Sequence, residues 1–208
     1  NRYGNFFSVS GAWSVNREKW FTLECVDLLK LRASYGSVGN VPIELYPSYS
    51  LYSVGVNYDS TPGALISQVG NPNLTWEKTF TSGIGLDLSL FKNRIRLTLD
   101  GYVKNTSNIL YKVPVTGLTG VTSIWKNIGK MRNTGVELTL GGDIIRTKDL
   151  TWAVDLNLTH NANELRDLYK QLDDNGNYIV KPVLISDGTN IAGTAQRILE
   201  IGEPVDTY

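Results

Sequence analysis

The 208-residue sequence contains one cysteine, one histidine and no excess of charge of either sign. The lone Cys25 can form neither an intrachain disulfide nor a cysteine-based metal site. His160 has no second histidine with which to share a metal, so we expect a structural role for both residues. The 20 basic side chains balance the 20 acidic ones, so no charge imbalance points to nucleic acid or to an anionic surface.

Catalytic motifs are also missing. The sequence has no Ser-His-Asp order, no glycine-rich phosphate loop and no HExxH, so we expect no enzyme activity, no cofactor and no bound metal. The acidic pair Asp173-Asp174 precedes Asn-Gly and is read as part of a turn. No apolar run approaches the roughly 18 residues of a transmembrane helix. The opening residues do not have the pattern of a signal peptide, and we expect the chain to begin inside a longer protein.

Alternation of polar and apolar residues is what the sequence does contain, and it is strictest in the segment 75–104. A tight turn at Lys92-Asn93 would pair Leu88 with Leu97, which places the apolar faces of both strands on one side. The residues expected on that apolar face, which would meet lipid, include Leu86, Leu88, Leu97, Leu99, Leu138, Leu156 and Leu158. Those expected on the polar face, toward a lumen, are Asp87, Arg96, Thr98, Asp100, Glu137, Asp155 and Asn157.

About six such strands can be counted, each roughly ten residues or longer, which is the length that crosses a bilayer at a tilt. Short turns near 92–93 and 146–149 alternate with long connections at 40–74, 105–132 and 165–208. The connection 17–28 is intermediate and should contain one helical turn. This asymmetry is typical of an outer-membrane barrel with periplasmic turns and extracellular loops. The predicted fold class is therefore all-β, with antiparallel up-and-down strands forming part of a transmembrane barrel.

Several segments resemble the SusC/RagA family of TonB-dependent outer-membrane transporters of Bacteroidetes. They are LLKLRASYGSVGN (28–40), GNPNLTWEKTFTSGIGLDLSLFKNRIRLTLDGYVKNTSNILY (70–111), NIGKMRNTGVELTLGGDII (127–145), TWAVDLNLTHNANEL (151–165) and IGEPVDTY (201–208). The resemblance implies the later part of a barrel of about 22 strands. It also implies that residues 1–208 form a partial barrel domain, with the family's plug domain and final strands missing.

The resemblance further implies a function and a set of partners. The function is energy-coupled import of a large nutrient, a glycan or an oligopeptide, with this chain supplying wall and loops. The implied partners are a SusD-like lipoprotein lid, the TonB-ExbB-ExbD system acting through the N-terminal part, and outer-membrane lipid.

Candidate binding residues lie in the long connections, where aromatic side chains could stack on sugars or anchor an interface. They are Tyr46, Tyr49, Tyr52, Tyr58 and Trp125. The alternative is that these rings only pack the loops or meet a partner subunit. Two other functions remain open: a soluble β-sandwich module that binds carbohydrate or protein, and a barrel-shaped hydrolase.

Overall fold

The computed structural model describes residues 3–41, 44, 46–58, 61–115, 120–168, 170–172, 178–180, 183–185 and 197–205. Apart from one short 3-10 helix, η1 (Val15–Arg17), every element in this part of the chain is a strand. The six long-sheet strands are β1 (Ser8–Ser14), β2 (Val26–Asn40), β5 (Glu77–Leu90), β6 (Ile95–Ser107), β9 (Lys130–Arg146) and β10 (Thr151–Asp167). The others are β3 (Leu51–Tyr58), β4 (Thr61–Gln68), β7 (Leu110–Pro114), β8 (Ser123–Asn127), β11 (Lys170–Leu172), β12 (Tyr178–Val180), β13 (Val183–Ile185) and β14 (Arg197–Leu199).

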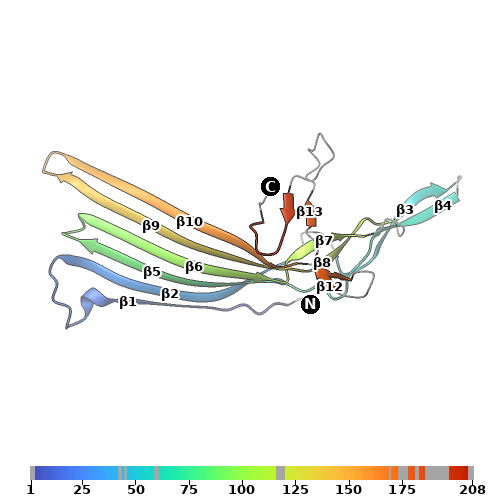
Figure 1. Cartoon of the computed structure of the whole chain (residues 1–208), viewed down its shortest axis with the longest axis horizontal. Coiled ribbons are helices and arrows are strands. Elements are labelled where there is room, and N and C mark those ends of the chain that lie inside the picture. Colours follow the sequence, from blue (N-terminus) through green and yellow to red (C-terminus); the bar gives the residue numbers. More distant parts are fainter. Residues whose placement is uncertain are drawn as a thin grey trace.

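The main body is one antiparallel sheet with strand order β1-β2-β5-β6-β9-β10. Each strand of the sheet pairs with the next one along the chain, and the intervening strands form separate two-stranded hairpins. Figure 1 shows the six strands side by side as one long curved layer. The predicted all-β, up-and-down arrangement is confirmed. Among the described residues no helix is long and apolar enough to cross a membrane.

The hairpin between β5 and β6 has the predicted register. Leu88 pairs with Leu97, and Asp87 pairs with Thr98. The turn is longer than the predicted two residues, because β5 ends at Leu90 and β6 begins at Ile95. Phe91 adopts a left-handed φ of 55°, as do Lys92 and Asn93, so three residues rather than two reverse the chain.

Strand lengths differ from the expectation in both directions. Strand β1 has only 7 residues, whereas β9 and β10 have 17 each. Strand β1 ends at Ser14, because the next residue, Val15, begins η1 and is buried. The helical turn expected in the connection before β2 is therefore present, and it starts slightly earlier than 17–28.

The connections are asymmetric, as predicted. At one end of the sheet, residues 91–94 and 147–150 form short turns. At the other end the connections are long and carry the hairpins β3–β4 and β7–β8 (Figure 1). The long connection predicted at 105–132 is shorter, because β6 continues to Ser107 and β9 begins at Lys130. The backbone pairing of β6 and β9 continues beyond the last apolar residue of each strand, so the connection between them is shorter than the alternation of apolar residues indicates.

The two faces of the sheet differ sharply in chemistry. Backbone pairing aligns leucines into two complete cross-strand rows, which we call the leucine band. One row is Leu31, Leu86, Leu99, Leu138 and Leu158, and the next is Leu29, Leu88, Leu97, Leu140 and Leu156. Many of these side chains are exposed, including Leu99, Leu156 and Leu158. A contiguous exposed apolar surface of this size marks contact with a membrane or another protein.

The sheet has no core of its own. In the described part of the chain, the buried apolar residues are confined to loops, to η1, to the short strand β7 and to the far end of β10. A second sheet packed on the leucine band, which a soluble β-sandwich requires, is not among the described elements. Within these residues the outer edge of β1 is unpaired, and that of β10 is paired only at Leu165, which exchanges backbone hydrogen bonds with Gly202 and Glu203.

Candidate functional site

The polar face of the sheet gathers the charged residues that the alternation singled out. Register places Asp87 beside Thr98, Asp100 beside Glu137, and Asn157 beside Thr139. The hydroxyl of Thr139 donates a hydrogen bond of 2.8 Å to the Asn157 side chain. All seven predicted polar-face residues therefore share one surface, opposite the leucine band.

One arginine bridges three strands of this face. Arg32 on β2 donates two hydrogen bonds, of 2.9 and 3.0 Å, to the carboxylate of Asp87 on β5. The same guanidinium reaches Asp100 on β6, with its Nη2 2.9 Å from Oδ1. Between them lies Gly85, which pairs with Arg32 on one side and with Asp100 on the other. A Cβ on Gly85 would stand 2.5 Å from the Asp100 carboxylate and 2.7 Å from Arg32 Cζ, so a larger residue there would displace the bridging side chains.

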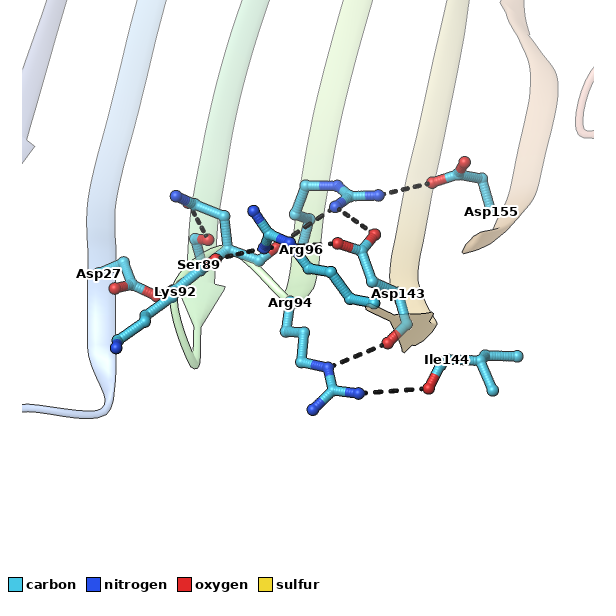
Figure 2. A network of polar contacts seen from close by, with 10 residues as sticks. Asp27, Ser89, Lys92, Arg94, Arg96, Asp143, Ile144 and Asp155 are labelled. Atoms are coloured by element: carbon cyan, nitrogen blue, oxygen red, sulfur yellow. Dashed lines mark hydrogen bonds and ion pairs between the residues drawn. The ribbon is translucent and has the colours of Figure 1, made fainter. Parts of the chain in front are cut away.

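The same arrangement recurs one strand pair away. Arg96 on β6 crosses Gly141 on β9 and lies 3.5 Å from the carboxylate of Asp155 on β10. A Cβ on Gly141 would stand 2.3 Å from that carboxylate. Arg96 also donates a 3.1 Å hydrogen bond to Asp143, which is the most buried of these carboxylates with 11% of its side chain exposed. Figure 2 shows Arg96 held between Asp143 and Asp155.

A β-bulge in β9 accounts for the hydrogen bonds of Arg94, which lies near Arg96 at the short-turn end of the sheet. The pairing of β9 with β10 shifts between Trp152 and Ala153, so Ile144 has no partner. Arg94 donates hydrogen bonds to the carbonyl oxygens of Asp143 (3.2 Å) and Ile144 (3.3 Å) (Figure 2). The side chain of Arg94 thus satisfies backbone groups that the bulge removes from the ladder.

A shallow depression of about 660 Å³ occupies the middle of the polar face. Its floor includes Gly83 and Gly85, and its walls carry Arg32, Asp100 and Glu137. Unlike Asp100, Glu137 has no ion-pair partner among the described residues. This surface offers both charge signs and hydroxyl groups, which suits polar cargo or another polar protein surface.

A second site lies between two of the long connections. Glu44 accepts hydrogen bonds from the ammonium of Lys112 on β7 and from the indole N–H of Trp125 on β8. The Lys112 ammonium also lies 5.3 Å from the centre of the Trp125 ring. The hydrogen bond from Lys112 is the main cause, and that from Trp125 the second, of a Glu44 pKa lowered from its ordinary value. A polar cavity of about 290 Å³, which we call the loop pocket, opens here and is lined by these three residues and by Gln68 and Ser123.

The predicted loop aromatics do not form one site. Trp125 lines the loop pocket, but none of the tyrosines does. Tyr46 and Tyr49 pair edge to face with ring centres 6.4 Å apart, and both are mostly exposed. Tyr52 is mostly exposed on β3, and the side chain of Tyr58 lies outside the described part of the chain.

Backbone contacts fix the base of these connections to one another. The side chain of Asn127 accepts a 2.7 Å hydrogen bond from the Thr75 N–H and donates one of 2.8 Å to the Thr75 carbonyl. The Asn71 side chain donates to the Trp125 carbonyl at 2.9 Å. The carboxylate of Glu77 accepts from the Leu110 N–H at 3.2 Å. The β7–β8 hairpin is therefore attached to the segment that precedes β5.

Four functional residues were not among the sequence candidates: Arg32, Glu44, Lys112 and Asp143. Arg32 had a usable signal, because it lies in phase on the polar side of a predicted strand. Glu44 and Lys112 had none, because loop conformation decides their meeting. No group of three or more potential ligands (His, Cys, Asp or Glu) that could hold a metal occurs in the part that the structure describes. Cys25 is exposed beside the β5–β6 turn, where its carbonyl accepts from the Phe91 N–H.

Residues 6–195 match the family described as "TonB dependent receptor-like, beta-barrel". TonB-dependent receptor P39 of Formosa agariphila is 38% identical over 181 residues, covering 86% of this chain and 17% of that protein. TonB-dependent receptor SusC of Bacteroides thetaiotaomicron is 34% identical over 213 residues, covering 95% of this chain and 20% of that protein. The solved structure of the RagAB peptide transporter superposes with a TM-score of 0.80 at 31% identity, over 96% of this chain and 20% of that one. The chain thus spans about a fifth of the length of these similar proteins.

Proposed function

This chain belongs to the SusC/RagA-type TonB-dependent receptors, which are β-barrel proteins of the outer membrane, and from that premise we propose that the complete protein imports a large nutrient across that membrane. The chain supplies a sector of barrel wall and several loops to this process. The observation that carries the proposal is the single long sheet with opposite faces, because such a sheet suits lipid on one side and an aqueous lumen on the other.

The orientation of the sheet follows from the same chemistry. The leucine band faces lipid, and the polar face with Asp87, Arg96 and Asp100 faces the lumen and any plug domain inside it. Nitroxide labels at Leu158 and at its neighbour Asn157, in the complete protein, test this. We expect oxygen to reach the first label from the lipid and a water-soluble relaxation agent to reach the second. The reverse pattern would invert the assignment.

The long connections lie outside the cell and the short turns in the periplasm in this proposal, which the difference in connection length supports. Single cysteines at Tyr52 and at Asn93 can be labelled on intact cells with an impermeant maleimide. We expect labelling at Tyr52 alone. Labelling at Asn93 alone would mean that the short turns are extracellular and the long connections periplasmic.

The cargo is a glycan or an oligopeptide. The RagAB structure is that of a peptide transporter, which supports a peptide cargo. The loop pocket supports the glycan, because it combines one indole face with hydroxyl and amide groups, and its Glu44 and Lys112 neutralise each other. Uptake assays with the complete protein should compare a fluorescent oligosaccharide panel with labelled peptides. Trp125→Ala should reduce uptake of the true cargo class, and Tyr52→Ala serves as the exposed-aromatic control.

Two partners complete the proposal. A SusD-like lipoprotein would cover the long connections as a lid, and the TonB-ExbB-ExbD system would act through the N-terminal part of the complete protein. Affinity purification of the complete protein from its own membranes should recover a stoichiometric lipoprotein. Recovery of the barrel alone under mild detergent would count against the lid.

A further inference from the structure

A row of basic side chains lies where the apolar face ends, on the side of the long connections. Lys78, Ser107 and Lys130 are aligned across β5, β6 and β9 by backbone pairing. Arg132 lies two residues closer to the leucine band on β9, and Arg166 is on the neighbouring β10. By the two-residue period of a strand, Lys78, Lys130 and Arg132 are on the leucine side of the sheet. We call Lys78, Lys130, Arg132 and Arg166 the basic rim.

The positive charge of the basic rim is only partly neutralised. Arg166 forms a 2.8 Å ion pair with Glu164, and Lys130 lies 3.9 Å from Asp167. Lys78 is exposed, and neither it nor Arg132 has an ion-pair partner among the described residues. The Nε of Arg132 is buried and has no hydrogen-bond acceptor in that part of the chain. Two cations with unmet demand for an anion therefore lie at the edge of an apolar surface.

An apolar furrow starts directly below the basic rim. Its volume is about 580 Å³, and small side chains at Ser82, Gly101, Thr134 and Ala162 form it. Thr134 follows Arg132 by one step on the same face of β9, so the furrow and the cation are adjacent. A Cβ on Gly101 would meet only Ile84 Cγ1, at 3.7 Å, so the furrow is open at this point.

We propose that the basic rim and the furrow together bind one anionic membrane lipid, with its phosphate on Lys78 and Arg132 and an acyl chain in the furrow. This proposal rests on the proposed function, in which the leucine band faces lipid. Charge complementarity selects the occupant, because basic residues at a membrane surface attract anionic headgroups. The furrow lies between the basic rim and the leucine band, so an acyl chain that descends from a headgroup on the rim passes through it. The alternative occupant of the rim and furrow is a protein partner, and the experiment below distinguishes it from a lipid.

The test uses the complete protein, purified and delipidated in detergent. Native mass spectrometry measures adducts with dimyristoylphosphatidylglycerol and with dimyristoylglycerol, which lacks the phosphate. The variant is K78Q/R132Q, and the matched control is K92Q/K148Q, which removes two exposed lysines at the short-turn end. We expect phosphatidylglycerol affinity to fall by about 25-fold in the first, taking about fivefold for each basic residue at a surface. The control should bind as the unmodified protein does, and dimyristoylglycerol should bind weakly to all three.

A second variant separates the furrow from the rim. Gly101→Leu fills the furrow and changes no charged residue. The backbone position can accept a Cβ, because the nearest atom, Ile84 Cγ1, would lie 3.7 Å away. It should weaken dimyristoylphosphatidylglycerol binding severalfold and leave dihexanoylphosphatidylglycerol binding unchanged. Equal phosphatidylglycerol binding by K78Q/R132Q and by its control overturns the proposal. The proposal is also overturned if a protein co-purifies with the unmodified protein and with the control but not with K78Q/R132Q, because a protein partner would then occupy the basic rim. The nitroxide at Leu158 separates failure of the lipid-binding proposal from failure of the proposed orientation of the sheet. If that label lies in lipid while K78Q/R132Q and its control bind lipid equally, the orientation holds and the lipid site alone is refuted.

Discussion

Replacing Gly85 by alanine should weaken the sheet, although the same change at Gly101 should strengthen it. Both glycines are interior to long strands, where glycine costs about 0.5–1 kcal/mol relative to alanine. At Gly101 the new methyl group has space, since its nearest neighbour lies at 3.7 Å. At Gly85 the methyl group would occupy the path by which Arg32 reaches Asp100, at 2.5–2.7 Å from both side chains.

The magnitude follows from what the Gly85 methyl group displaces. A hydrogen bond to a charged group contributes about 1.5–3 kcal/mol. Arg32 and Asp100 are each 36% exposed, so solvent screening reduces their share to about 1–2 kcal/mol. Subtracting the general gain from alanine leaves a net loss of about 0.5–1 kcal/mol for Gly85→Ala. Gly101→Ala should gain about 0.5–1 kcal/mol.

Hydrogen exchange followed by mass spectrometry on the complete protein measures these local free energies. Peptides that cover β5 and β6 should exchange about 2–5 times faster in Gly85→Ala and about 2–5 times slower in Gly101→Ala. In a background that lacks both Arg32 and Asp100 side chains, Gly85→Ala should also slow exchange. If Gly85→Ala protects the native sheet as well as Gly101→Ala does, the arginine bridge does not depend on glycine and the reasoning fails.

Three further outcomes are expected. Leu97→Arg should cost about 2–4 kcal/mol near the bilayer centre, and Thr98→Arg under about 1 kcal/mol, in urea titrations of the complete protein in vesicles; the opposite ranking would contradict the facing. Because the folded-state pKa of Glu44 is lowered, its contact with Lys112 contributes stability above the ordinary value of 4.5 and loses it as pH falls through the lower, folded pKa. A nitroxide at Thr122 should therefore gain mobility on acidification, and Lys112→Gln should abolish that change. The 208 residues expressed alone should aggregate or pair edge to edge rather than yield a heat-modifiable monomer, because each unpaired backbone group in hydrocarbon costs several kcal/mol.

The sheet was predictable from sequence to the level of individual residue pairs. The period-two pattern fixes which side chain faces which way, and the turn at Lys92-Asn93 fixes the β5–β6 register, so Leu88 and Leu97 meet as expected. The pattern loses information where polar residues continue on both faces. This is why β6 and β9 run further than the alternation indicated.

The sites were less predictable, for two physical reasons. Each arginine bridge crosses a glycine in the middle one of three strands. In the sequence such a glycine cannot be told from any other small residue of an alternating segment, because its place under the bridge depends on the register of both strand pairs. The loop pocket depends on the backbone paths of two connections that share no periodic signal. Trp125 was recognised as an aromatic in a loop, but its partners Glu44 and Lys112 could not be inferred.

The extra length of β9 and β10 has a consequence for the height of the protein above the membrane. On the leucine side of β10 the apolar side chains end at Ala162, and the strand continues to Asp167. At about 3.3 Å per residue and a tilt of about 40°, those five residues raise the wall by about 13 Å. This collar spans the layer of lipid headgroups that the basic rim contacts, and the hairpins β3–β4 and β7–β8 start from its outer end. A bulky cargo can therefore approach the loop pocket from the side, without first passing through the layer of lipid headgroups.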